Sequence, residues 1–143
     1  MKDKRIAVIG DNSYEWSITY LATVCGTGIV VPLDKELKAN ELMQLIANSE
    51  VSCVFFADRY EKIFREMLDS GDTILKMLVN MDADVSQKKV HSLRTLVEEG
   101  NQLLQEGDRS YLDAQINRDE MSILLFTSAV SYTHLTLPTK RIV

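Results

Sequence analysis

The sequence predicts an α/β fold in which helices cover a mostly parallel sheet. Short apolar runs rich in β-branched residues recur along the chain, as is typical of buried strands. A segment with apolar residues at helical spacing follows most of them. The connections between them are short, and strands that alternate with helices pair in parallel. The chain has 143 residues, of which 45% are hydrophobic, so it can bury a core of single-domain size.

The first unit is a strand over residues 4–10 and a helix that runs to Cys25. Asn12 and Glu15, three residues apart, predict a capping box at the start of this helix. Gly26 and Gly28 are expected to stop the helix. Its apolar side chains, expected to face the core, are Tyr14, Ile18, Leu21 and Cys25.

Two further units follow the same pattern. The second has a strand over residues 29–31, ended by Pro32, and a helix over residues 40–48. The third has a strand over residues 51–56 and a helix that Asp58 is expected to cap and Gly71 to end. The expected buried stripes of these two helices are Leu42, Leu45 and Ile46, and Ile63, Phe64, Met67 and Leu68.

The last part of the chain is predicted to hold two more strands and one helix. A strand is expected over residues 74–79, followed by a charged loop over residues 82–89. A polar segment over residues 108–119 separates the helix at 93–105 from a final strand over residues 121–126. The expected buried residues of that helix are Leu93, Leu96, Val97, Leu103 and Leu104.

Composition excludes several classes of function. The net charge is −5 and no basic patch is interleaved with aromatic residues, which argues against nucleic-acid binding. No apolar run approaches the roughly 20 residues of a transmembrane helix, and residues 1–5 with the short apolar run after them are not expected to form a signal peptide. Cys25 and Cys53 both lie in apolar stretches, so two buried thiols in a reducing cytosol are expected rather than a disulfide or a zinc site.

Most polar features along the chain have a structural interpretation. The run from Gly10 to Ser13 opens a helix, but the glycines of a dinucleotide fingerprint are absent, so capping is favoured over phosphate binding. Gly26-Thr27-Gly28 is typical of a tight turn. His91 is expected to be solvated and Trp16 to pack in the core. Two acidic pairs are also expected to be solvated: Asp82 with Asp84, and Glu98 with Glu99.

Thr127 and Ser128 differ from these features because they directly follow an apolar strand. Two hydroxyl groups there would lie at the carboxyl edge of a parallel sheet, where α/β proteins bind their ligands. Glycines after them would add an anion-binding nest of backbone N–H groups, but the sequence continues Ala129-Val130-Ser131-Tyr132.

Several segments, in order, resemble the AMP-forming acyl-CoA synthetases of the adenylate-forming superfamily. The likeness covers nearly all of residues 3–128. Asn12-Ser13-Tyr14-Glu15-Trp16 is similar to the family's "N-S-x-E-W" helix, and the run to Val31-Pro32-Leu33-Asp34 is similar to its "V-P-L-D" segment. The run from Asp119 to Ser128 resembles the approach to the family's phosphate loop, "T-S-G-T-T-G".

The resemblance implies the incomplete N-terminal part of an AMP-binding domain, over residues 1–128. The parent would be a cytoplasmic ligase, able to lie at a membrane surface, that uses ATP, Mg²⁺ and CoA to activate a carboxylate, with a fatty acid expected. Thr127 and Ser128 would begin the ATP phosphate loop. No catalytic residue and no metal ligand of the family falls in this chain. The chain itself is therefore expected to be inactive and to bind none of these cofactors well.

Residues 129–143 are interpreted as a non-native, disordered tail. The tail resembles the translation of a transposon-based sequencing adapter, because the adapter codons GTC-TCT-TAT-ACA-CAT encode Val130 to His134 in order. The adapter's leading CT, preceded by one G from the gene, gives GCT for Ala129. The foreign sequence would then begin one base into the codon for the first glycine of the phosphate loop.

Two alternatives stay open from the sequence. One is an adenylation domain of a peptide synthetase, which would share the same N-terminal segments. The other is a small, non-catalytic, flavodoxin-like binding domain, for which Asp11 is the only candidate residue at a strand end.

Overall fold

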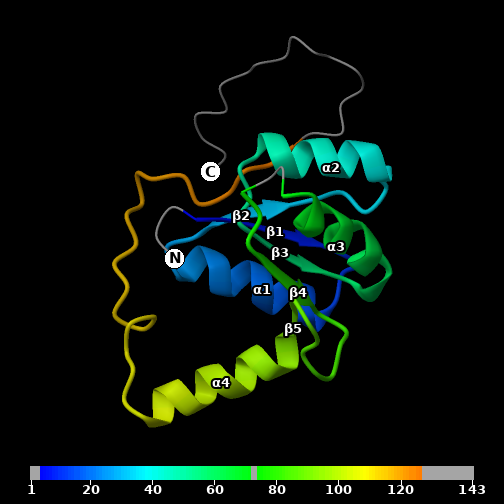
Figure 1. Cartoon of the computed structure of the whole chain (residues 1–143). Coiled ribbons are helices and arrows are strands. Elements are labelled where there is room, and N and C mark those ends of the chain that lie inside the picture. Colours follow the sequence, from blue (N-terminus) through cyan, green and yellow to red (C-terminus); the bar gives the residue numbers. More distant parts are fainter. Residues whose placement is uncertain (1–3, 72–73, 127–143) are drawn as a thin grey trace.

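A computed structural model of the chain describes residues 4–71 and 74–126, and it confirms the α/β fold class. Five parallel strands form one sheet that lies between two layers of helices (Figure 1). The strands are β1 (Arg5–Ile9), β2 (Ile29–Pro32), β3 (Cys53–Phe56), β4 (Met77–Asn80) and β5 (Val90–Ser92). The helices are α1 (Tyr14–Cys25), α2 (Ala39–Asn48), the short 3₁₀ helix η1 (Asp58–Tyr60), α3 (Glu61–Ser70) and α4 (Leu93–Gln105).

The order of the strands across the sheet is β2-β1-β3-β4-β5. In the centre of the sheet Ala7 of β1 pairs with Val31 of β2 on one side and with Val54 of β3 on the other. The chain therefore moves outward in one direction after β1 and in the other direction from β3 onward. The gap between β1 and β3 is the topological switch point, and flavodoxin-like sheets share this order.

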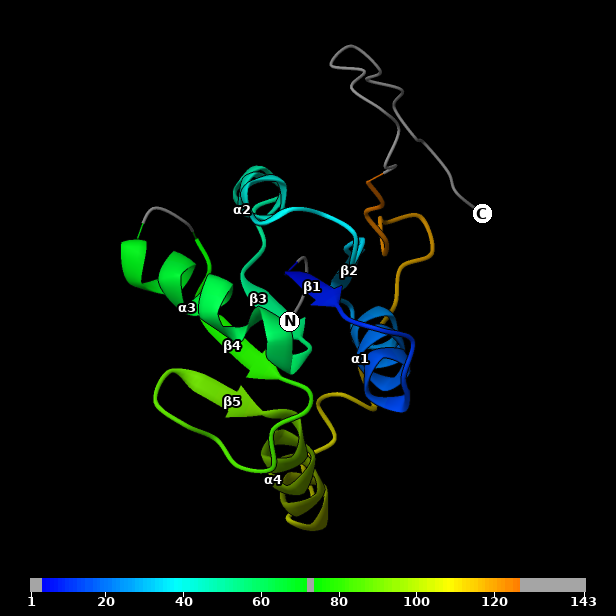
Figure 2. The same ribbon diagram turned by 90° about the vertical axis from the view of Figure 1, so that its right-hand side faces the viewer.

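The two faces of the sheet are covered to different extents. Helices α2 and α3 lie on one face and α1 and α4 on the other, as the two perpendicular views show (Figures 1 and 2). On the α2/α3 face Leu42, Phe56 and Phe64 are fully buried, and the expected stripes of both helices pack there. On the α1/α4 face a smaller group of buried residues is packed by partly buried side chains such as Trp16 and Leu96.

The expected buried stripe of α1 is wrong in three of its four positions. Tyr14 and Leu21 are 75% and 57% exposed and Cys25 is exposed, whereas Thr19 and Thr23 are buried. The buried hydroxyls cost little, because Thr19 donates to the Glu15 carbonyl at 2.8 Å and Thr23 to the Thr19 carbonyl at 2.8 Å. Their methyl groups are then free to pack toward the sheet.

The expected burial of α4 is also largely wrong. Leu93 is buried and Leu96 is partly buried, but the exposed fractions of Val97, Leu103 and Leu104 are 46%, 49% and 50%. Only the first turns of α4 reach the sheet after β5, so the apolar stripe continues beyond the surface that covers it.

Neither of the two expected N-caps, Asn12 and Asp58, caps its helix. Ser13, not Asn12, caps α1, since its hydroxyl accepts a hydrogen bond from the Trp16 N–H at 3.1 Å. Asp58 does not cap a helix but lies in η1, where its carboxylate accepts from the Asn80 amide at 2.9 Å. Gly71 ends α3 as expected, with a φ of 70° that favours glycine.

In the later part of the chain, from residue 74 onward, the strands differ from those that the sequence predicts. β4 begins at Met77, since Ile74 is 52% exposed and lies outside the sheet. The three-residue strand β5 was not predicted. The expected strand over residues 121–126 is reduced to one parallel bridge, between Ile123 and Val30.

The two cysteines are both free, but only Cys53 is buried as expected. Burial raises the pKa of the Cys53 thiol to about 12, whereas Cys25 is exposed at the end of α1. We expect a thiol reagent at about pH 8 to modify one thiol per native chain quickly and the second only after denaturation, because the thiolate is the reactive form. The Cys25→Ser variant is the control and should lose the fast phase. Two fast thiols in the native protein would contradict the burial of Cys53.

Candidate functional site

Charged residues from three strand ends meet at the carboxyl edge of the sheet. Asp11 follows β1, Lys35 follows β2 and Arg59 follows β3. The Lys35 ammonium lies 3.0 Å from Asp11 Oδ1, and the Arg59 guanidinium lies 2.8 Å from Asp11 Oδ2. We call these three residues the switch-point triad, because they span the gap between β1 and β3.

The triad favours the ionised form of Asp11. Hydrogen bonds from Arg59 and from Lys35, with the charges of both, lower the pKa of Asp11 from 3.8 to about 2. The same contacts raise the pKa values of Lys35 and Arg59. Arg59 also lies over the Tyr60 ring, with its guanidinium carbon 4.9 Å from the ring centroid. All three charged groups therefore form ion pairs with one another, and these ion pairs connect the ends of three strands.

A depressed carboxylate pKa makes the stability that Asp11 contributes dependent on pH. This contribution is complete above the ordinary pKa of 3.8 and is lost as the pH falls through about 2. We expect Asp11→Asn to lower the urea midpoint at about pH 5 by a small amount, since the pairs are exposed, and to have less effect near pH 2. Asp119→Asn, at an exposed carboxylate far along the chain, is the matched control. An effect of Asp11→Asn that is equal at both pH values would contradict the role of the triad.

Gly10 packs closely rather than opening a phosphate site. A Cβ at this position would lie 3.2 Å from Ala57 Cβ and 3.3 Å from Met81 Cε, so glycine lets the end of β1 approach the end of β3. The N-terminus of α1 beyond it is capped by Ser13. The structure therefore supports the capping interpretation of residues 10–13.

The free edge of β2 is extended by the segment that leads toward Thr127. The Val30 N–H donates to the Ser122 carbonyl at 2.9 Å, and the Leu124 N–H donates to the Val30 carbonyl at 2.9 Å. This pairing is parallel, so the segment runs in the same direction as β2, toward the carboxyl edge of the sheet. Thr127, Ser128 and residues 129–143 lie outside the described residues.

The other polar candidates are structural, as expected. His91 is exposed on β5, and Trp16 stacks on Tyr20 with ring centroids 5.4 Å apart. Gly26 and Thr27 form the expected turn, in which Thr27 has a φ of 67°. The acidic pairs are exposed; Asp82 accepts from the Asp58 N–H at 2.8 Å, and Asp84 pairs with Arg94 at 3.0 Å.

Among residues 4–71 and 74–126, no three His, Cys, Asp or Glu side chains come close enough to hold a metal ion. Within the same ranges no helix is long and apolar enough to cross a membrane.

Sequence reasoning found Asp11 but missed its partners. Lys35 and Arg59 are the first basic residues after β2 and β3, which is the signal that could have identified them. This signal becomes useful only when the strand order is known, because the order brings the three strand ends together.

Comparisons with known proteins agree with this fold. The family model described as "AMP-binding enzyme" matches residues 1–129. No curated protein sequence matches the chain significantly.

Three solved structures illustrate the structural likeness. A coronafacic acid ligase from Pectobacterium brasiliense is 19% identical with a TM-score of 0.67, covering 87% of this chain and 24% of that one. A long-chain-fatty-acid–CoA ligase from Archaeoglobus fulgidus is 17% identical with a TM-score of 0.67, covering 90% and 23%. The N-terminal domain of FACL13 from Mycobacterium tuberculosis is 16% identical with a TM-score of 0.62, covering 89% and 29%. This chain therefore spans about a quarter of the length of the structures that it matches.

Proposed function

Because this chain belongs to the family of AMP-binding enzymes, we propose that its parent protein is an AMP-forming acid–thiol ligase. In the first step a carboxylate oxygen attacks the α-phosphate of ATP, and pyrophosphate leaves to give an acyl-adenylate. In the second step the CoA thiol, as its thiolate, attacks the acyl carbon, and AMP leaves. Mg²⁺ would neutralise the phosphate charge in the first step.

The family match along residues 1–129 is the observation that carries this proposal. The coronafacic acid ligase and the long-chain-fatty-acid–CoA ligase are both described as ligases, and one of them as a CoA ligase. The strand order alone would fit a flavodoxin-like binding domain equally well. The family match favours the enzyme over that alternative.

We assign Thr127 and Ser128 to the start of the ATP phosphate loop of the parent. The bridge between Ile123 and Val30 supports this assignment, because it directs the preceding segment toward the carboxyl edge of the sheet. The family match does not extend past residue 129, which is in keeping with the further proposal that the tail over residues 129–143 is foreign to the parent. Sequencing the same locus past the codon of Ser128, with adapter sequence removed, tests both assignments.

The substrate that we propose is a fatty acid, in keeping with the name of the Archaeoglobus fulgidus structure. The test uses the parent enzyme, expressed from an uninterrupted copy of the gene, with ATP, Mg²⁺ and CoA. AMP and acyl-CoA should form in equal amounts with a long-chain fatty acid and not with acetate or amino acids. Activation of an amino acid without transfer to CoA would instead favour a peptide-synthetase adenylation domain.

The 143-residue chain itself is expected to be inactive. The family glycines that would follow Ser128 are replaced by Ala129 and the residues after it, so the backbone cradle for the phosphates is incomplete. We expect no AMP release above the ATP-only blank, and Ala129→Gly should not restore it. Carboxylate-dependent AMP formation by the purified chain would contradict this prediction.

A further inference from the structure

Pro32 is the last residue of β2, and it has a different effect on the two sides of that strand. On the inner side, pairing with β1 continues past Pro32, because the Leu33 N–H donates to the Val8 carbonyl at 2.9 Å. On the outer side, within the described part of the chain, pairing with residues 121–126 is limited to the hydrogen bonds of Val30. The outer pairing therefore ends before the inner pairing does.

The missing N–H of proline explains why the outer pairing stops. Alternate residues of a strand direct their backbone groups toward the same neighbour, so positions 30 and 32 both face the outer segment. Val30 donates to the Ser122 carbonyl and accepts from the Leu124 N–H, both at 2.9 Å. The next hydrogen bond would run from position 32 to the Leu124 carbonyl, but Pro32 has no N–H to donate.

The outer segment loses its contact with the sheet at the same point. Leu124 is partly buried and packs against the core of the α2/α3 face. The next two residues, Leu125 and Phe126, are 47% and 38% exposed. Thr127, which we assign to the start of the ATP phosphate loop, follows directly in the sequence.

We infer that Pro32 is a positioning residue for the phosphate loop of the parent. A loop of this kind holds phosphates through its backbone N–H groups, and these groups are available only where they are not used in a ladder. By ending the outer ladder, Pro32 leaves the residues after Leu124 free to turn away from the sheet. The role in the loop rests on the proposed function, whereas the end of the ladder is a property of the described chain.

The connection that follows Pro32 is held by contacts that do not involve the proline ring. The Asp34 carboxylate accepts from the Glu36 N–H at 2.9 Å. The Tyr60 hydroxyl donates to the Lys35 carbonyl at 3.2 Å. A substitution at Pro32 is therefore expected to change the outer edge of β2 and to leave this connection in place.

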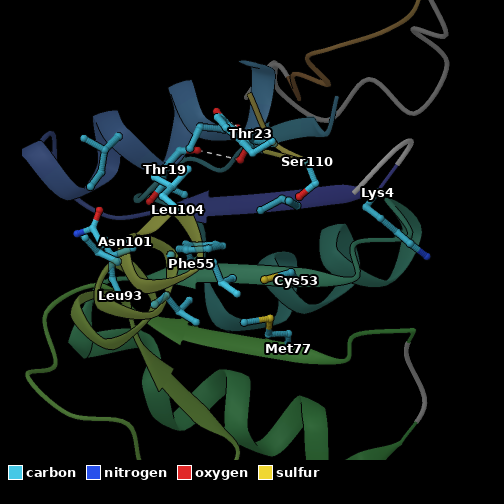
Figure 3. Close-up of a pocket in the computed structure, with 18 of the residues that line it drawn as sticks. Lys4, Thr19, Thr23, Cys53, Phe55, Met77, Leu93, Asn101, Leu104 and Ser110 are labelled. Carbon is cyan, nitrogen blue, oxygen red and sulfur yellow. Dashed lines mark hydrogen bonds between the residues drawn. The ribbon is translucent and has the colours of Figure 1, made fainter. Parts of the chain in front are cut away.

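The large apolar groove of the molecule lies away from this edge. It has a volume of about 950 Å³ on the α1/α4 face, where residues such as Thr19, Phe55 and Leu104 line it (Figure 3). None of the described residues 29–33 and 121–126 belongs to its lining. Substitutions at the end of β2 therefore test the outer pairing separately from the packing of that face.

Pro32→Val in the 143-residue chain tests where the pairing ends. Valine suits a strand and supplies the missing N–H. We expect the new amide at position 32 to be protected, and the Phe126 N–H to exchange with D₂O at least about tenfold more slowly than in the unsubstituted chain. The melting temperature should stay the same or rise, because the added hydrogen bonds offset the entropy that proline removes from the unfolded chain. Amide exchange followed by NMR measures this, and Pro32→Ala should behave alike.

Ile29→Val is the matched control in the same strand. Its N–H donates to the Lys4 carbonyl at 2.9 Å on the inner side, so this substitution adds no donor on the outer side. The exchange of the Phe126 N–H should then be unchanged. Fast exchange at both position 32 and Phe126 in both Pro32 variants would overturn the inference, because proline would not be what ends the ladder.

The same substitution in the parent, expressed from an uninterrupted gene, tests the role of Pro32 in the reaction. A longer ladder would draw the start of the loop toward the sheet, so the rate of carboxylate-dependent ATP–pyrophosphate exchange should fall by about tenfold or more. Transfer from a supplied acyl-adenylate to CoA should be unchanged, because pyrophosphate has already left at that step. Ile29→Val should leave both half-reactions unchanged.

The two half-reactions separate positioning from a general loss of structure. An unchanged first half-reaction in Pro32→Val, or an equal loss in both half-reactions, would overturn the positioning role. An unsubstituted parent that shows no ATP–pyrophosphate exchange with any carboxylate would instead contradict the proposed function. Amide exchange in the 143-residue chain needs no substrate, so it decides where the outer ladder ends in either case.

Discussion

Phe64→Ala is expected to lower the free energy of unfolding of the chain by about 3–5 kcal/mol. Phe64 is 0% exposed on α3, and its ring centroid lies 5.2 Å from that of Phe56 and 6.4 Å from that of Tyr60. Alanine would leave a cavity in the middle of the α2/α3 face, where neighbours on the sheet cannot move to fill it. With a urea dependence of about 1–3 kcal/mol per molar, the midpoint should fall by about 1 M or more.

Tyr14→Ala is the matched control for this substitution. It also removes an aromatic ring from a helix, but Tyr14 is 75% exposed, so we expect a change within about 0.5 kcal/mol. Circular dichroism in a urea titration measures both variants. A loss of less than about 1 kcal/mol for Phe64→Ala would mean that the α2/α3 face is not the main core.

The α2/α3 face could be predicted from the sequence because its signals are local. Leu42 and Ile46 are four residues apart on one helix, and the strand that they cover is a continuous apolar run. The helix and the strand pack against side chains that belong to this same chain. Periodicity is therefore enough to predict which side chains become buried.

The α1/α4 face could not be predicted in the same way. The apolar stripe of α4 marks Val97 and Leu104 for burial, but periodicity does not show whether the covering surface is present. On α1 the buried positions belong to threonines, which the apolar pattern overlooks. Both errors fall on the same face, where the apolar side chains of α4 stay partly exposed and α1 buries threonines.

The switch-point triad depends on topology rather than on local pattern. Asp11, Lys35 and Arg59 are separated by more than twenty residues along the chain, and only the order β2-β1-β3 brings them within hydrogen-bond distance. Strand β5 was missed for a different reason. Three residues with an exposed His91 at the centre carry too little pattern to be separated from a loop.

Asn80→Leu is expected to destabilise the chain by about 2–4 kcal/mol, although the two side chains are similar in size. Asn80 is 1% exposed at the end of β4 and uses both ends of its amide. Its NH₂ group donates to Asp58 at 2.9 Å and to Glu61 at 2.7 Å. Its oxygen accepts from the backbone N–H groups of Asp82 and Ala83 at 2.9 and 3.2 Å. Leucine would leave these two N–H groups without a partner beside the core.

Asn80→Asp tests the donor side of this network separately from the acceptor side. It keeps an oxygen acceptor for the two backbone N–H groups but places a third carboxylate beside those of Asp58 and Glu61. Repulsion between like charges should raise the pKa of the new aspartate, so the variant is destabilised at neutral pH and regains stability as the pH falls through that raised pKa. Asn80→Leu has no titratable group and should not regain stability in this way. Asn40→Ala, on the exposed side of α2, is the control, with an expected change within about 0.5 kcal/mol. If the urea midpoints of both Asn80 variants instead matched that of the unsubstituted chain at neutral pH, the Asn80 network would not be what fixes the end of β4 to the start of α3.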